Sequence, residues 1–533
     1  MANQFDIVVI GSGFGGSVTA CRLAQAGRSV LILERGREWS PEDYPRSPDD
    51  AWIWDDNEPE KQNGWIDLRC FGDMTVVQGA AVGGGSLIYA NISVEAEPFV
   101  FNEGWPAGIT YETLKPHYKT VGEMLGVQEI PDNQLTERFM LMREGANALG
   151  HGDRFRKLPL AVTFDPNYSY ADNDPHNDNR SQPWVNEQGQ AQGTCVHCGN
   201  CDIGCQVKAK NTLDLNYLAA ARSAGAEIRA GHIVRNLEKT EDGGYRVHFD
   251  RIENGSLIPG TLLAKRVVLA AGSLGSTELL LRCRDQFGTL PAISSRLGYG
   301  WSSNGDFLTP ALYSNRRISP TRGPTITCAI DFLDGSQDGN RFFVEDGGFP
   351  DALGNSVEEL SRNASKIGGV LGRMFTKLAK TTRGRDPLNC IMPWFGQAID
   401  ASDGRLYMGR NWWNPFGSKK LKLDWNINKS EAVIEAMVDM HKKLSAATGG
   451  TPIDPLYWRW FRNLVTPHPL GGCCMGSGPE SGVVDGEGRV FGQDGLYVVD
   501  SAILPKAIGL NPSRTIAALA EHAARKMIEE QQG

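Results

Sequence analysis

The pattern of apolar and polar positions along the chain predicts an α/β protein. Residues 5–10 are a short apolar run rich in β-branched side chains, which is typical of a strand buried on both faces. Residues 17–26 follow with the spacing of a helix, and residues 29–33 form a second apolar strand. The chain therefore opens with a strand, a helix and a second strand.

Similar segments recur along the rest of the chain. Further buried strands are expected at residues 227–228, 232–234, 266–272 and 496–500, and helices at 111–125, 213–224, 276–283, 431–447 and 515–529. Shorter runs are expected to form a small excursion at 245–249 and 262–263, and antiparallel strands of a second domain at 323–333, 341–344, 406–408 and 421–423. The return of buried strands after these excursions indicates one sheet assembled from separated segments.

One predicted helix, residues 356–380, has an apolar stripe surrounded by lysines and arginines. Such a stripe usually packs on a core, which is the interpretation we favour. The alternative is peripheral contact with an anionic membrane surface.

Composition narrows the class of protein. A chain of 533 residues is longer than one hydrophobic core usually serves, so two domains are expected. The net charge of −9 argues against a general nucleic-acid binder. No run of 18 apolar residues is present and no secretory signal precedes the first strand, so we expect a cytoplasmic enzyme without a transmembrane segment.

The first strand leads into a glycine motif that predicts a dinucleotide site. Gly11, Gly13 and Gly16 form G-x-G-x-x-G between the strand and the helix. Glycine at these positions permits the tight turn, the approach of a pyrophosphate and close packing of helix on strand. Glu34 ends the second strand, where a carboxylate can accept hydrogen bonds from ribose hydroxyls. Because the strand, the helix, the second strand and Glu34 follow one another at the expected spacing, a glycine-rich turn without a ligand is a poor alternative.

A second glycine-rich loop occupies residues 82–87 and is followed by Tyr89 to Ile92. Three consecutive glycines let the backbone approach a flat or anionic ligand. We therefore expect this loop to take part in the same site.

Four cysteines have the C-x2-C-x2-C-x3-C spacing of a bacterial ferredoxin cluster: Cys195, Cys198, Cys201 and Cys205. In two-cluster ferredoxins the fourth cysteine serves the other cluster, so a single cluster here would need another ligand, such as Cys70. An iron–sulfur cluster, a zinc site and a metal-free group of buried thiols all stay open, and no metal ligand is assigned.

These motifs together resemble the glucose–methanol–choline (GMC) family of FAD-dependent oxidoreductases. The resemblance rests on GSGFGG…LILERG, the GGGSL loop, HPLGG at residues 468–472 and LYVVDSAILPKAIGLNPSRTIAALAE near the C-terminus. Within the family the chain is most similar to the cholesterol-oxidase branch. The resemblance implies a Rossmann-type FAD domain from residues 1–95, 206–310 and 462–533, and an α+β substrate domain with a large antiparallel sheet from residues 96–205 and 311–461.

The resemblance also implies which residues hold FAD. Glu34 would bind the adenosine ribose, the backbone of Val234 would meet adenine, and His468 would lie over the flavin beside Asn511. Residues 83–100 contain no histidine that could attach FAD covalently, so noncovalent FAD is implied. The expected cofactor-binding residues are Gly11, Ser12, Gly13, Phe14, Gly15, Gly16, Glu34, Arg35, Gly83, Gly84, Gly85, Ser86, Ala90, Asn91, Ile92, Val234, Asp500, Ser501, Asn511, Pro512 and Ser513.

His468 and Asn511 suit the oxidation of an alcohol, in which a hydride passes from the carbinol carbon to flavin N5. A histidine at position 468 can accept the hydroxyl proton, because the unperturbed pKa of a histidine side chain lies near neutrality. Asn511 can hydrogen-bond the alcohol oxygen. We therefore expect an alcohol oxidase or dehydrogenase for a bulky apolar alcohol such as a sterol or hydroxysteroid, with oxygen or a redox carrier as electron acceptor.

Other functions remain alternatives. A polyol, sugar or aromatic-alcohol dehydrogenase of the same family would have the same motifs. A flavin and iron–sulfur electron-transfer subunit would account for the cysteine run. An NAD-dependent dehydrogenase is supported by the first glycine motif alone. Family members that also isomerise a steroid double bond use a carboxylate on a substrate-domain strand. The corresponding stretch here, residues 387–397, has none, which argues against isomerisation.

Overall fold

The computed structural model describes residues 4–47, 49–169, 178–350, 388–410, 416–453 and 464–530. The expected basic helix at 356–380 lies outside the described residues. No helix among the described residues is long and apolar enough to cross a membrane.

A seven-stranded sheet is built from three separated parts of the chain. Its neighbouring strands are β8 (Glu227–Arg229), β2 (Val30–Leu33), β1 (Gln4–Ile10), β11 (Ser256–Leu269), β10 (Tyr245–Glu253) and β9 (His232–Lys239), and β21 (Leu496–Val498) also pairs with β11. From β8 to β11 and on to β21 every pair is parallel, and the four residues of β2 are all buried. This confirms the expected α/β sheet.

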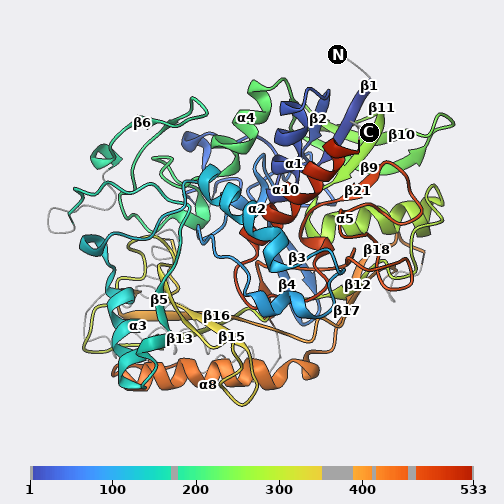
Figure 1. Ribbon diagram of the computed structural model, residues 1–533. Coiled ribbons are helices and arrows are strands. Elements are labelled where there is room, and N and C mark those ends of the chain that lie inside the picture. The colour runs from blue at the N-terminus through green and yellow to red at the C-terminus, as the bar shows by residue number, and fades with distance from the viewer. Residues whose placement is uncertain are drawn as a thin grey trace.

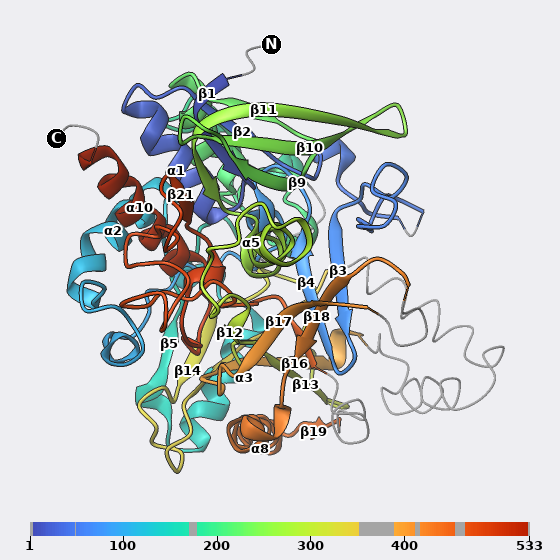
Figure 2. The ribbon, with the colours of Figure 1, turned by 90° about the vertical axis from the view of Figure 1, so that its right-hand side faces the viewer.

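A six-stranded sheet lies in the lower half of the molecule in Figure 2. Its order is β19 (Thr451–Pro452), β13 (Phe307–Leu312), β16 (Ile391–Ala398), β15 (Phe342–Glu345), β14 (Cys328–Asp331) and β5 (Phe155–Lys157). All of its pairs are antiparallel, which confirms the large antiparallel sheet. The proposed domain boundaries themselves stay a prediction.

The described residues also form three smaller sheets. One consists of β12 (Tyr299–Trp301), β17 (Gly404–Gly409) and β18 (Lys420–Asp424), another of β20 (Leu464–Thr466), β4 (Met74–Gly79) and β3 (Ile66–Phe71), and a hairpin of β6 (Trp184–Val185) and β7 (Ala191–Gln192). Because β20 pairs in parallel with β4, the segment before His468 lies beside the segment that leads into the second glycine loop.

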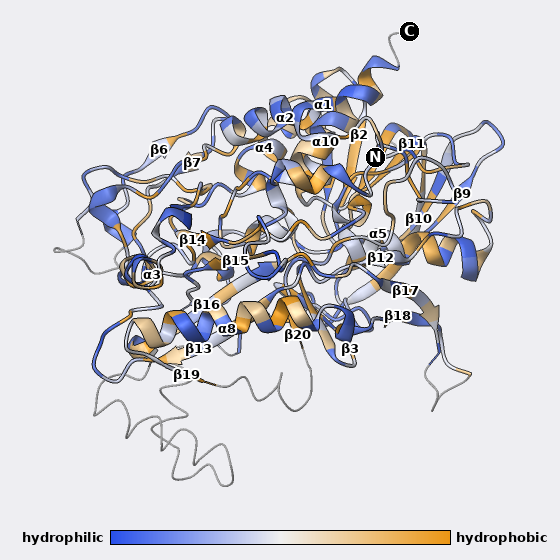
Figure 3. Ribbon diagram, turned by 60° about the horizontal axis from the view of Figure 1, so that its bottom comes forward, coloured by the Kyte–Doolittle hydropathy of each residue, from blue (hydrophilic) through white to orange (hydrophobic). Residues whose placement is uncertain are grey.

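The described α-helices cover the two main sheets. They are α1 (Phe14–Gln25), α2 (Tyr111–Met124), α3 (Glu137–Ala148), α4 (Tyr217–Ser223), α5 (Gly272–Leu281), α8 (Glu431–Ala447) and α10 (Ser513–Glu529). Figure 1 shows α8 along the bottom, beneath β13 and β16, while α1, α2 and α10 lie together at the other end. In Figure 3 α8 has hydrophobic and hydrophilic residues around it, as expected for a helix with one face on a sheet.

Two expectations about elements were wrong in detail. The helix expected at 213–224 is interrupted at Asn216, where φ is −130° and ψ is −87°, and the Asn216 side chain caps α4 by accepting a hydrogen bond from Tyr217 N at 2.7 Å. The excursion expected at 245–249 and 262–263 is part of the main sheet. There β11 is one continuous strand that pairs with β10 and, through residues 263–269, also with β1.

Candidate active site

The first glycine motif is held between the ends of two strands. A Cβ atom on Gly11, whose φ is +97°, would lie 2.4 Å from the carbonyl oxygen of Ala270, which follows β11. A Cβ atom on Gly15 would lie 2.2 Å from the carbonyl oxygen of Val499, which follows β21. A Cβ atom on Gly16 would lie 2.1 Å from the Gly11 oxygen. Packing alone therefore requires glycine at these positions.

Other glycines leave space open. A Cβ atom on Gly13 or on Gly85 would meet nothing within 4 Å, and both residues line a cavity. Gly84, whose φ is +52°, brings the second loop against the first, because its Cβ atom would lie 2.8 Å from the Gly13 Cα atom. The two loops thus form a cradle whose open side a side chain would fill. This arrangement fits the phosphates of a dinucleotide, which glycine-rich loops at a helix N-terminus bind.

Glu34 organises the first turn. Its carboxylate accepts hydrogen bonds from Ser12 N at 2.9 Å, Ser12 Oγ at 2.7 Å and Gly36 N at 3.0 Å. A carboxylate has about four acceptor positions, so Glu34 keeps capacity for a further donor, and it lines the cavity. Its predicted contact with a ribose is compatible with this geometry.

The cavity has a volume of about 560 Å³, and most of the expected site residues line it. Four expected residues do not line it. Gly16 packs on the Gly11 backbone, the Gly83 amide donates to Ser12 Oγ at 3.0 Å, Ser86 Oγ donates to the Gly83 oxygen at 2.7 Å, and Asn91 is fully buried with φ +68°. The expected residues that do line it are Gly11, Ser12, Gly13, Phe14, Gly15, Glu34, Arg35, Gly84, Gly85, Ala90, Ile92, Val234, His468, Asp500, Ser501, Asn511, Pro512 and Ser513.

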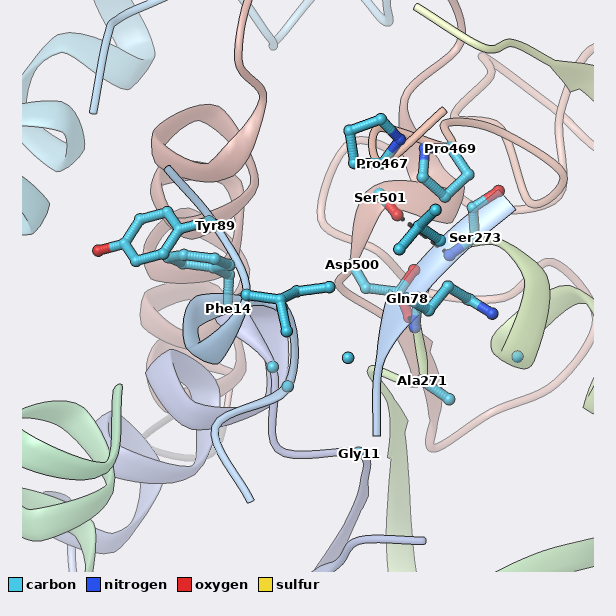
Figure 4. A pocket seen from close by; sticks show the side chains of 18 of the residues that line it. Gly11, Phe14, Gln78, Tyr89, Ala271, Ser273, Pro467, Pro469, Asp500 and Ser501 are labelled. Atoms are coloured by element: carbon cyan, nitrogen blue, oxygen red, sulfur yellow. Dashed lines mark hydrogen bonds between the residues drawn. The ribbon is translucent and has the colours of Figure 1, made fainter. Parts of the chain in front are cut away.

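The cavity wall has aromatic and polar sides. In Figure 4 the rings of Phe14 and Tyr89 lie together on one side, with centroids 5.6 Å apart in an edge-to-face arrangement. Asp500 and Ser501 lie on the other side. Burial raises the pKa of Asp500 to about 6, although its carboxyl accepts hydrogen bonds from Gly272 N at 2.9 Å and Ala502 N at 2.8 Å. Asp500 thereby ties the start of α5 to the segment that follows β21.

His468 is oriented by a residue that the sequence analysis missed. Its Nδ1 atom lies 2.8 Å from Oδ1 of Asp306, which is fully buried. The other carboxylate oxygen of Asp306 accepts hydrogen bonds from Thr466 Oγ1 at 2.6 Å and from His468 N at 3.2 Å. Burial raises the pKa of Asp306, while His468 opposes that rise. The His468 ring is therefore fixed in the cavity wall.

Asn511 is brought to the same cavity by the segment that contains Asp306. Asn304 Nδ2 donates to the Leu510 oxygen at 2.9 Å, and Asn304 Oδ1 accepts hydrogen bonds from Ile508 N and Gly509 N. Asn304 itself has φ +55° and is fully buried. One short stretch before β13 thus positions both expected catalytic residues, although neither Asn304 nor Asp306 belongs to a recognisable motif.

The cavity has an apolar region near His468. The Phe395 ring lies 6.4 Å from the His468 ring, measured between centroids. Two of the other lining side chains, Leu308 and Val465, are 39% and 53% exposed, so the apolar wall extends toward solvent. The apolar side chains of this wall are Leu308, Ile326, Phe395, Val465, Pro467 and Pro469.

Asp202 is a further lining residue that the sequence analysis missed. Burial raises the pKa of its carboxyl to about 6, and the nearby cations of Lys210 and Arg138 only partly oppose this rise. Its neighbour Cys201 accepts a hydrogen bond through its backbone oxygen from Lys210 Nζ at 2.7 Å. Lys210 also donates to the Leu87 oxygen at 2.8 Å, so the cysteine segment is tied to the second glycine loop.

The four clustered cysteines are free thiols and none of them lines the cavity. Burial raises the pKa values of Cys195, Cys198 and Cys205, which favours the neutral thiol. Among the described residues, no group of three or more His, Cys, Asp or Glu side chains could hold a metal ion. The geometry therefore gives no support to an iron–sulfur or zinc site in this part of the chain.

Known proteins are similar to this chain over nearly its whole length. Two family models described as GMC oxidoreductase match residues 183–284 and 401–520, and one described as an NAD(P)-binding Rossmann-like domain matches residues 9–41. A cholesterol oxidase of Acinetobacter baumannii is 32% identical over 99% of this chain and 96% of its own length. A cholesterol oxidase of Mycobacterium tuberculosis is 32% identical over 98% of this chain and 91% of its own length.

Solved structures agree on the fold. The crystal structure of pyridoxine 4-oxidase from Mesorbium loti matches with a TM-score of 0.61 at 18% identity, covering 98% of this chain and 99% of that one. The two glycine loops, the His468 and Asn511 pair and the full-length similarity lead to one conclusion. The chain belongs to the GMC oxidoreductase family, in its cholesterol-oxidase-like branch.

Proposed function

We propose that this protein oxidises a bulky, largely apolar alcohol such as a sterol or hydroxysteroid. The observation that carries the proposal is that His468 and Asn511 line one cavity together with both glycine loops and an apolar wall. Only in such an arrangement do a proton acceptor, a polar group for the alcohol oxygen and a cofactor cradle serve the same substrate.

FAD is the cofactor of this family, and the residues present fit it. The open space at Gly13 and Gly85, the remaining acceptor capacity of Glu34 and the start of α10 at Ser513 suit a dinucleotide with a polar ring edge. When bound, FAD supplies the hydride acceptor at N5. We propose that it is held without a covalent link, because no histidine lies in residues 83–100.

The chain's own residues would manage the alcohol oxygen and its proton. With Asp306 accepting the proton of His468 Nδ1, Nε2 is left free to accept the hydroxyl proton. Asn511 would donate to the alcohol oxygen and hold the carbinol carbon in a reactive position. Both roles are proposals that rest on the shared cavity.

The apolar wall favours a bulky apolar substrate over a polyol or sugar. Four of its side chains, Leu308, Ile326, Phe395 and Val465, offer no hydrogen-bonding group to a polyol. The similarity to two cholesterol oxidases supports a sterol, and the choice between oxygen and another electron acceptor is part of the proposal. A cytoplasmic location likewise stays a prediction.

An alcohol panel, assayed with oxygen and with an artificial dye, tests the proposal. We expect fastest reduction of the flavin by sterols and other bulky secondary alcohols, and acid precipitation should release all of the yellow colour into the supernatant. The variant His468→Asn should slow flavin reduction by about 10²–10⁴ while FAD stays bound. Preferential oxidation of sugars or polyols would contradict the substrate class, and colour in the pellet would contradict noncovalent binding.

A further inference from the structure

One carboxyl group in the cavity wall accepts no hydrogen bond from any residue that the structure describes. Five carboxyl side chains of the described residues line the cavity. Four of them are hydrogen-bonded to backbone amides or to arginines: Glu34, Asp56, Glu278 and Asp500. The fifth is Asp202, which follows Cys201 in a turn of 3₁₀ helix and is partly exposed. Because it makes neither a hydrogen bond nor an ion pair in the described part of the chain, its oxygens keep their acceptor capacity for a ligand.

Two cations act on Asp202, and both direct N–H groups at other residues. Lys210 and Arg138 lower its pKa, against the larger effect of burial. Lys210 Nζ donates to three backbone oxygens, at 2.8 Å from Leu87, 3.3 Å from Tyr89 and 2.7 Å from Cys201. Arg138 donates to the backbone oxygens of Arg322, Pro324, Thr325 and Asp346. The cations therefore favour the carboxylate form without pairing with it, which leaves a position that a donor in the cavity can complete.

The segment that carries Asp202 joins the second glycine loop to the apolar wall. Gly323 N donates to the His197 oxygen at 3.0 Å, and the chain continues from this contact to Thr325 and Ile326, which line the cavity. The same segment is tied to the second glycine loop through the buried lysine. Asp202 therefore belongs to the part of the wall where the loop and the apolar side chains meet.

The surroundings of Asp202 favour a neutral hydrogen-bond donor over a cation. Its pKa of about 6 leaves the carboxyl ionised at pH 7.5, where it can only accept hydrogen bonds. An ammonium group on a ligand would be repelled by Lys210 and Arg138. A ketone or an ether brings no proton, whereas a hydroxyl group does. Neither His468 nor Asp306 is among the groups that shift the pKa of Asp202, which indicates a position separate from the reacting hydroxyl group.

We propose that Asp202 is a specificity-determining residue that accepts a hydrogen bond from a second hydroxyl group of the substrate, separate from the one that is oxidised. The preferred substrate is then a bulky apolar diol, such as a steroid diol, and not a sterol with a plain hydrocarbon tail. The contact binds the substrate without making or breaking a covalent bond. This inference rests on the proposed function, because it narrows the substrate class of the same cavity.

Three matched steroids test the proposal: a diol, the mono-ol that lacks the second hydroxyl group, and the keto-alcohol in which a ketone replaces that group. Hydrogen bonds to an ionised carboxylate are stronger than those between neutral groups, so kcat/KM at pH 7.5 should be about tenfold to a hundredfold higher for the diol than for the other two. The difference should lie in KM, with flavin reduction at saturating alcohol equal within about threefold, because the contact is the same before and during hydride transfer.

Two variants of Asp202 separate this contact from simple packing. Asp202→Leu removes the acceptor, so the preference should reverse and the mono-ol should become a better substrate than the diol. Asp202→Asn keeps nearly the same shape and can donate to a ketone as well as accept from a hydroxyl group, so kcat/KM for the keto-alcohol should come within about threefold of that for the diol. A wild-type preference for the diol that persists in these variants would overturn the inference. If Asp202→Leu fails to fold, the result with Asp202→Asn decides alone.

The rate at which the holoprotein loses FAD distinguishes a contact with substrate from one with the cofactor. After dilution, the fluorescence of released flavin should rise in Asp202→Asn at the wild-type rate, within about twofold. Release that is tenfold faster would assign the carboxyl group to FAD and overturn the inference. A wild-type protein whose flavin is reduced by none of the three steroids would contradict the proposed function itself. Flavin reduction with equal kcat/KM for the diol and the mono-ol would overturn this inference alone.

Discussion

Asp306 Oδ1 lies 2.8 Å from Nδ1 of His468, and the two residues are 162 positions apart in the chain. The Asp306 side chain is fully buried, whereas that of His468 is 17% exposed toward the cavity. A carboxylate at Nδ1 selects the tautomer with the proton on that nitrogen. It therefore determines which nitrogen of His468 can act on a substrate.

The first prediction concerns this pair. Asp306→Asn can donate an amide N–H to Nδ1, which moves the histidine proton to Nε2 and removes the proton acceptor. We expect flavin reduction to fall by about 10²–10⁴, with little change in alcohol affinity, measured by stopped-flow reduction at several alcohol concentrations. The double variant with His468→Asn should be no slower than His468→Asn alone. A wild-type rate in Asp306→Asn would show that the pair is only structural.

The second prediction separates the cofactor cradle from the fold. Gly13 has φ −70°, which alanine adopts freely, and its Cβ atom would meet nothing within 4 Å. Gly13→Ala should therefore leave the melting temperature of the apoprotein unchanged and weaken FAD binding roughly tenfold or more, because the methyl group enters the cradle. FAD titration and thermal unfolding measure the two effects.

Matched glycine variants serve as controls for that experiment. Gly15→Ala should destabilise the apoprotein itself, since its Cβ atom would lie 2.2 Å from the Val499 oxygen. Gly108→Ala should change neither property, because Gly108 has open space and does not line the cavity. Unaltered FAD affinity in Gly13→Ala would place the cofactor elsewhere.

The third prediction concerns pH and Asp202. Burial raises the pKa of this carboxyl to about 6, and it lines the cavity. Below that pH the side chain is neutral and costs less to cover with an apolar ligand, so binding of an apolar alcohol should strengthen as the pH falls from about 7.5 to 5. In Asp202→Asn the change of affinity between pH 7.5 and 5 should be smaller than in the wild type, and any remainder near pH 6 belongs to Asp500, whose pKa burial also raises to about 6. A wild-type pH dependence that survives in this variant would assign it to another group.

The fourth prediction is that the cysteine cluster takes no part in the alcohol chemistry. None of its members lines the cavity, so Cys198→Ser should reduce its flavin within about twofold of the wild-type rate in a single turnover. The exposed Cys70 provides a control variant, Cys70→Ser. If Cys198→Ser folds and binds FAD but is reduced orders of magnitude more slowly, the cluster belongs to the mechanism.

The amino-acid sequence alone was sufficient to predict those parts of the candidate site that are formed by residues close together in the chain. The turn from β1 into α1 needs Gly11, Gly13 and Gly16 at fixed spacing, and Glu34 follows because β2 ends beside that turn. These constraints act through the backbone of one strand–helix–strand unit, so they leave a local pattern. The last helix was expected at residues 515–529 and begins at Ser513, directly after Pro512, which is compatible only with the first turn or the cap of a helix.

Only the tertiary structure decided which distant groups act on those motifs. The contact of Asp306 with His468 and that of Asn304 with the Leu510 backbone leave no periodic signal, because each joins segments that are far apart in the chain and meet only in the folded protein. The same holds for Asn216, whose cap splits a helix that apolar spacing predicts as continuous. Burial and register, which set the charge and direction of a side chain, are properties of the packed sheets, whereas spacing along the chain records only local backbone geometry.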